Sequence, residues 1–179
     1  GGNSVAFADI CGRQDLEIPP LSEKTRKELN TFVRLAGNST RNPLDLWMVQ
    51  REVQLYRQVM EIALADPAID LAIVDRVVGG LDLFDDDERP EGDQEKGLRE
   101  VNDFLIEFSR NNPFGKPLVV SLDLYGSDIY CADNAAQLRR KFVTSGVPAY
   151  PSLESAARAM ARFINYHEFH KKHGYSNQQ

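Results

Sequence analysis

Short apolar runs alternate with longer segments of helical period along the chain. Residues 70–78 are nearly continuous in β-branched and apolar side chains, 117–123 form a second such run, and 147–150 form a third, shorter one. This composition is typical of strands that are buried on both faces of a parallel sheet. Residues 44–47 follow an Asn-Pro turn signal and predict a further strand.

The segments between these runs carry apolar residues at helical spacing, together with residues that start or end helices. Serine side chains accept hydrogen bonds at helix starts, and a glycine with positive φ commonly ends a helix. Helices are predicted at residues 4–14, 23–33, 51–65 and 94–111. A fifth helix passes through 135–142 and ends at Gly146, and the last helix follows Ser152.

This alternation of strands and helices predicts right-handed crossovers and a parallel sheet with helices on both faces, the α/β class. The first helix starts directly after Gly1-Gly2, with no strand before it. A glycine turn of this kind normally follows a strand. We therefore expect that the first strand of the sheet is missing from the chain, because it was cut away or lies outside this sequence.

The size and composition of the chain restrict its class. The 179 residues, 42% of them hydrophobic and 27% charged, predict one globular domain over 1–170 with a tail at 171–179. A net charge of −6 argues against a nucleic-acid partner, and no apolar stretch is long enough to span a membrane. Two distant cysteines and no visible signal peptide favour a cytoplasmic protein.

Two glycine pairs are candidates for phosphate binding. Gly1 and Gly2, with Asn3 and Ser4, open a helix whose first N–H groups and dipole favour an anion. The alternative is that these glycines carry no function and that Asn3 or Ser4 only caps the helix. Gly79-Gly80 follows the strongest predicted strand, at the sheet edge where α/β proteins bind ligands, although a plain turn is an equal interpretation.

Other polar clusters have less specific patterns. The acidic run at 82–95 lacks the spacing of a calcium loop and is typical of a solvated loop. His167, His170 and His173 lie near the end of the last helix, where cations are favourable without a metal. Cys11 is predicted to be a core residue.

Taken together, the motifs resemble those of the NDP-forming acyl-CoA synthetases, over about residues 1–168. Each segment is weak alone, but five in the right order are fairly specific. The matching segments are residues 1–9 (glycine turn and first helix), 16–29, 42–46 ("NPxDL"), Tyr56 with 65–70 ("Y…ADPxxD") and 146–160 ("GVPvypspeeAaral").

The resemblance implies a flavodoxin-like, three-layer α/β/α domain of an enzyme related to succinyl-CoA synthetase. Such an enzyme joins a carboxylic acid to CoA with ATP or another NTP and magnesium, through an acyl phosphate and a phosphohistidine. In the family, glycine-started helices face the phosphohistidine. The resemblance therefore implies phosphate-binding roles for Gly1, Gly2, Asn3 and Ser4 and for the pair Gly79-Gly80.

The resemblance also implies what other domains supply. No histidine here matches the phosphorylated one, and the nucleotide-binding ATP-grasp domain is absent. We therefore expect no catalytic residue, no metal ligand and no cofactor bound by this domain, and an inactive isolated chain. The implied partners are CoA-binding, phosphohistidine and ATP-grasp domains or subunits, and a homodimer is compatible with the sequence.

Two alternatives remain open at this stage. The first is a degenerate synthetase-like domain with a scaffolding or regulatory role, for example in a protein acetyltransferase. The second is an unrelated flavodoxin-like binding or signalling domain. A response-regulator receiver would need an acidic pair after the first strand and a lysine at the end of the fifth, and no such lysine follows Tyr150.

Overall fold

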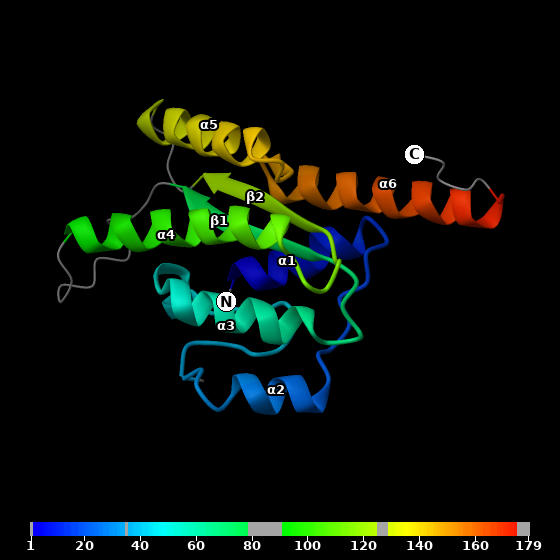
Figure 1. The fold of residues 1–179 in the computed structure, drawn as a ribbon, viewed down its shortest axis with the longest axis horizontal. Coiled ribbons are helices and arrows are strands. Elements are labelled where there is room, and N and C mark those ends of the chain that lie inside the picture. Colours follow the sequence, from blue (N-terminus) through cyan, green and yellow to red (C-terminus); the bar gives the residue numbers. More distant parts are fainter. Residues whose placement is uncertain (1, 35, 79–90, 125–128, 175–179) are drawn as a thin grey trace.

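A parallel three-stranded sheet forms the centre of the computed structural model, which describes residues 2–34, 36–78, 91–124 and 129–174 (Figure 1). Strand β1 (Ala72–Val78) pairs along its full length with β2 (Leu118–Leu124), and β3 (Ala149–Tyr150) pairs with β2 on the other side. A helix lies in each connection between consecutive strands. The predicted α/β class with a parallel, flavodoxin-like sheet is confirmed.

Helices cover both faces of this sheet, and Figure 1 shows α4 across its front. Alternate apolar side chains of β1 and β2, such as Val74 and Val120, pack with residues of α3, α4 and α5. On the other face α6 buries Ala156 and Ala157, and α1 packs against α6. The helical elements are α1 (Gly2–Gly12), α2 (Glu23–Leu29), the 3₁₀ helix η1 (Trp47–Arg51), α3 (Val53–Leu64), α4 (Glu91–Arg110), α5 (Ile129–Thr144) and α6 (Leu153–Lys172).

The helix-capping signals of the sequence are confirmed. The Ser22 hydroxyl accepts a hydrogen bond from the Thr25 N–H at the start of α2, and Ser152 accepts one from the Ser155 N–H at the start of α6. Gly146 follows α5 with φ of 87°, a conformation that glycine adopts at little cost. Among the described residues, no helix has the length and apolar character needed to cross a membrane.

The predicted strand at residues 44–47 is wrong. Within the part of the chain that the structure describes, this segment makes only an isolated antiparallel bridge between Ser39 and Asp45, and Trp47 already begins η1. An extended segment becomes a strand only when a neighbouring strand satisfies its N–H and C=O groups. No described strand lies beside residues 44–47 to do so.

Gly97 of α4 packs directly against the backbone of η1. A Cβ atom at this position would overlap the Arg51 carbonyl oxygen, which belongs to the backbone and cannot rotate away. We expect Gly97→Ala to lower the free energy of unfolding by about 1–3 kcal/mol, measured by urea denaturation. The matched substitution Gly12→Ala, where a Cβ has no neighbour within 4 Å, should not destabilise the protein. Equal effects of the two substitutions would contradict this packing.

Candidate functional site

A cleft of about 900 Å³ lies between α1, α3 and one edge of β1. The first turn of α1 opens onto it, and β1 lines it through Asp75. The segment that contains Asp45 forms a further wall. Because the glycine-started helix α1, whose first N–H groups favour an anion, begins at this cleft, the cleft is the candidate functional site.

Gly2, Asn3 and Ser4 all line the cleft at the start of α1. These predicted site residues are brought together with two carboxylates. The Ser4 hydroxyl donates a hydrogen bond to Asp45 Oδ2 at 3.4 Å, and the Asn3 side chain donates one to Asp75. The helix start that was predicted to bind an anion therefore lies beside negative charge. Gly1, Gly79 and Gly80, the other predicted site residues, lie outside the described residues.

Asp75 is the most perturbed acid of the cleft. Burial raises the pKa of its carboxyl from 3.8 to about 6, and the charge of Asp123 adds to this effect. Hydrogen bonds from the Ser121 hydroxyl, at 2.9 Å, and from Asn3 oppose the shift, as does the charge of Arg76. A carboxyl with this pKa changes charge between pH 5 and 7, so the electrostatics of the cleft depend on pH.

Asp123 lies on the same face of the sheet, on the neighbouring strand. The ladder pairs Asp75 with Ser121, which places Asp123 two residues farther along β2. Burial raises the pKa of Asp123, the charge of Glu154 raises it further, and a hydrogen bond from the Leu153 N–H lowers it. The N-terminus of α6 thus already has an internal carboxylate partner, which distinguishes it from that of α1.

Arg76 lies on the opposite face of the sheet from the start of α1, so it adds no cation there. Its side chain is only 1% exposed, and its Nε donates to Asn102 Oδ1 at 3.0 Å. The guanidinium lies over the Tyr56 ring, 5.8 Å from the ring centroid. Arg76 therefore connects β1 to α3 and α4 instead of facing an anion at α1.

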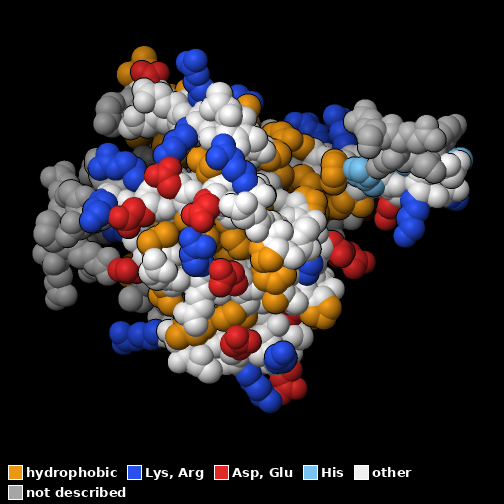
Figure 2. Space-filling view, viewed as in Figure 1, with side chains coloured by type: hydrophobic (Ala, Val, Ile, Leu, Met, Phe, Trp, Pro, Cys, Tyr) orange, Lys and Arg blue, Asp and Glu red, His pale blue; other side chains and the backbone are white. Residues whose placement is uncertain are grey.

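The histidines near the end of α6 contact aromatic rings. His170 packs on Tyr166 and His173 stacks on Phe169, each with ring centroids 4.1 Å apart. Figure 2 shows histidine beside hydrophobic side chains on the part of α6 that extends from the body. Among the described residues, no group of histidine, cysteine, aspartate or glutamate side chains is placed to hold a metal ion.

Sequence reasoning missed Asp75, which lines the cleft, and Asp123, whose charge raises the pKa of Asp75. A usable signal was present, because each is an acid inside a largely apolar strand. Acids are rarely buried in strands without partners, so such positions deserve consideration as site residues. Cys11, predicted as a core residue, is 5% exposed and lies against the cleft, and burial raises the pKa of its thiol.

The parallel sheet, its helical layers and a glycine-started helix at the cleft define a three-layer α/β domain. The chain is 30% identical over 159 residues, 89% of its length, to subunit alpha of the ADP-forming acetate–CoA ligase II from Pyrococcus furiosus. It is also similar to the crystal structure of PH0766 from Pyrococcus horikoshii OT3, with a TM-score of 0.59, 23% identity and 90% of this chain covered.

The match to the ligase subunit confirms the resemblance to the NDP-forming acyl-CoA synthetases that the motifs indicate, and the likeness to PH0766 shows the fold alone. It spans 30% of the ligase subunit and 32% of the PH0766 chain. No family model matches the chain.

Proposed function

We propose that this chain is one domain of an NDP-forming acyl-CoA synthetase and that the N-terminus of α1 helps to hold the phosphohistidine loop of a neighbouring domain. The complete enzyme would convert a carboxylic acid, CoA and ATP or another NTP into an acyl-CoA. The observation that carries the proposal is the placement of Gly2, Asn3 and Ser4 together at the cleft. Similarity to an ADP-forming ligase subunit supports it.

The chemistry of a helix start suits this role. The first N–H groups of a helix have no helical acceptor and, with the helix dipole, favour a phosphoryl group without any titratable side chain. The first turn of α1 contains no acidic residue of its own. The proposal keeps Gly1, Gly79 and Gly80, which lie outside the described residues, as further phosphate-binding candidates from the sequence.

The other components of the reaction belong to other domains in this proposal. CoA, nucleotide and magnesium would be bound by CoA-binding, phosphohistidine and ATP-grasp domains or subunits. Neither cysteine is in a disulfide, which supports a cytoplasmic location.

A scaffolding role is the second candidate function, and the acids of the cleft favour it. Asp45 and Asp75 lie next to the start of α1, and a carboxylate repels a phosphoryl group. Anion binding at α1 separates the two candidates, because a synthetase domain of the proposed kind requires it and a scaffold does not.

The isolated chain should form no acyl-CoA. Residues 1–179 would be incubated with CoA, ATP, magnesium and a panel of short carboxylic acids, and thioester would be measured. We expect no product above the rate without protein, because the chain has no residue matching the phosphohistidine. A complete ADP-forming acetate–CoA ligase serves as the positive control. Thioester formation by the chain alone would contradict the assignment of the catalytic groups to other domains.

A further inference from the structure

The second half of α6 projects beyond the sheet and carries an exposed aromatic surface (Figure 1). The first half of the helix is anchored, since Ala156, Ala157 and Met160 are buried. Farther along, three large aromatic side chains are about half exposed: Phe163 at 46%, Tyr166 at 55% and Phe169 at 53%. Histidine rings lie against them, from His167, His170 and His173. These six side chains form the α6 surface, and contiguous exposed patches of this kind mark interaction sites.

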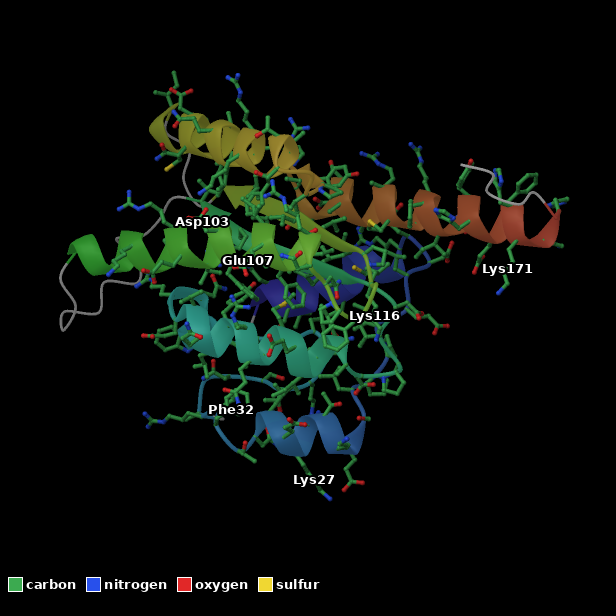
Figure 3. All side chains as sticks on the ribbon, viewed as in Figure 1. Lys27, Phe32, Asp103, Glu107, Lys116 and Lys171 are labelled. Atoms are coloured by element: carbon green, nitrogen blue, oxygen red, sulfur yellow. The ribbon has the colours of Figure 1, made fainter. Side chains whose placement is uncertain are left out.

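Basic side chains accompany the α6 surface. Between residues 158 and 173 the sequence has one acid, Glu168, and four cations: Arg158, Arg162, Lys171 and Lys172. Figure 3 labels Lys171 on the projecting part of the helix. No carboxylate of the described residues forms an ion pair with any of the four. A partner of complementary chemistry therefore combines carboxylates with apolar side chains.

Residues 81–88 of the chain have this composition. They contain five acids and no basic residue, and Asp85 to Glu88 form the longest acidic run of the sequence. Leu81, Leu83 and Phe84 add apolar side chains. Blocks of about five or more like charges are often interaction segments. This segment lies outside the described residues and connects β1 to α4. The sequence itself thus supplies a complementary partner for the α6 surface.

The segment of the same copy cannot reach the far end of the α6 surface. Helix α6 starts at the carboxyl end of the sheet, where the Leu153 N–H donates to Asp123. At about 1.5 Å per residue, His173 lies about 30 Å farther along the helix axis. Residues 79–90 leave β1 at the same end of the sheet and return to α4. None of them is more than about six extended residues, roughly 20 Å, from an anchor. The partner segment must therefore come from another copy.

We infer that the α6 surface binds residues 81–88 of a second copy of this chain. The carboxylates of the segment pair with the four cations of α6, and Leu83 and Phe84 pack against the exposed aromatic rings. Direct pairing of two α6 helices is less favourable, because it would bring their cations together. Each copy carries both halves of the contact, so the association joins different surfaces of the two copies.

Sedimentation of residues 1–179 over a range of protein concentrations tests this inference. In about 0.05 M salt, the average mass should rise with concentration above the 20.2 kDa of one chain. About 0.5 M salt should screen the ion pairs and weaken the association at least about tenfold. A mass of one chain at every concentration in low salt would overturn the inference, as would an association that salt leaves unchanged.

Two variants remove one half of the contact each. The first carries Asp85→Asn, Asp86→Asn and Asp87→Asn, and the second carries Lys171→Ala and Lys172→Ala. Each should weaken self-association about tenfold or more, because several ion pairs are lost together. The control carries Lys24→Ala and Arg140→Ala, which remove two cations from exposed positions on α2 and α5. It should associate as the unsubstituted chain does.

A mixture of the two variants tests the contact between copies directly. The first variant keeps an intact α6 surface, and the second keeps an intact acidic segment. The mixture should therefore associate more tightly than either variant alone at the same total concentration. A mixture no heavier than the separate variants would overturn the inference. Variants that associate as tightly as the unsubstituted chain would overturn it in favour of a different interface.

Discussion

Replacement of Asp66 by alanine is expected to lower the free energy of unfolding by about 2–4 kcal/mol. Asp66 is 1% exposed and connects the start of α2 to the turn after α3. Its carboxylate accepts hydrogen bonds from the Ser22 N–H at 2.7 Å and the Ala68 N–H at 3.0 Å. Lys116, labelled in Figure 3, donates to the Leu64 and Asp66 carbonyls of the same turn. Alanine would leave buried donors without acceptors.

Asp66 should also make the free energy of unfolding depend on pH in the acidic range. Burial alone would raise the pKa of Asp66, but hydrogen bonds from Thr25, Ala68 and Ser22 outweigh it and lower the pKa from 3.8 to about 2. The ionised form is therefore favoured in the folded state. Its contribution, about 2 kcal/mol, is fully present above pH 4 and is lost as the pH falls toward 2.

Urea denaturation between pH 2 and 7 measures both effects of Asp66. The exposed Asp70, four residues along the chain, provides the control, and Asp70→Ala should change stability by less than about 0.5 kcal/mol. A loss below about 1 kcal/mol for Asp66→Ala, or an acid dependence equal to that of the unsubstituted chain, would contradict the role given to this carboxylate.

In contrast to Asp66→Ala, the substitution Asp75→Asn should raise the free energy of unfolding at neutral pH. The folded-state pKa of Asp75, about 6, lies above its ordinary value of 3.8, so the protonated form is favoured in the fold. Stability due to this group is present below pH 4 and is lost as the pH rises through 6. Asparagine resembles the protonated form and should add up to about 3 kcal/mol above pH 7.

The measurement is thermal or urea unfolding of Asp75→Asn at pH 4.5 and 7.5. The increase in the free energy of unfolding over the unsubstituted chain should be large at pH 7.5 and small at pH 4.5. Asp9→Asn, on the exposed side of α1, where Asp9 pairs with Arg13, is the control and should change stability little at either pH. If Asp75→Asn destabilises the protein at pH 7.5, the carboxylate is better stabilised in the fold than its burial indicates.

The strands of the sheet could be predicted because their signal is local. Three short apolar runs became β1, β2 and β3, and the serines and the glycine at helix ends act as their local chemistry requires. Residues 44–47 carry a similar signal but form no strand, since pairing depends on a neighbour elsewhere in the chain. Local sequence cannot report whether that neighbour is present.

The candidate site was predictable only in part, for a similar reason. The glycine-rich start of α1 is a local motif, and it does lie at the cleft. The acids beside it are brought there by the register of β1 on β2 and by the loop that carries Asp45, which are long-range features. The sequence also could not show on which face of the sheet the Arg76 side chain lies, because helices cover both faces.

An anion titration tests the central claim most directly. Sulfate would be added to 15N-labelled residues 1–179 at pH 5.5 and 7.5, because its charge is constant over this range. We expect saturable shifts of the Gly2, Asn3 and Ser4 amides, with tighter binding at pH 5.5, where Asp75 is more protonated. The Leu153 amide, which already has Asp123 as an acceptor, should not respond. Shifts at Gly2 to Ser4 that are absent, or no larger than at Leu153, would contradict the proposed phosphoryl-binding role.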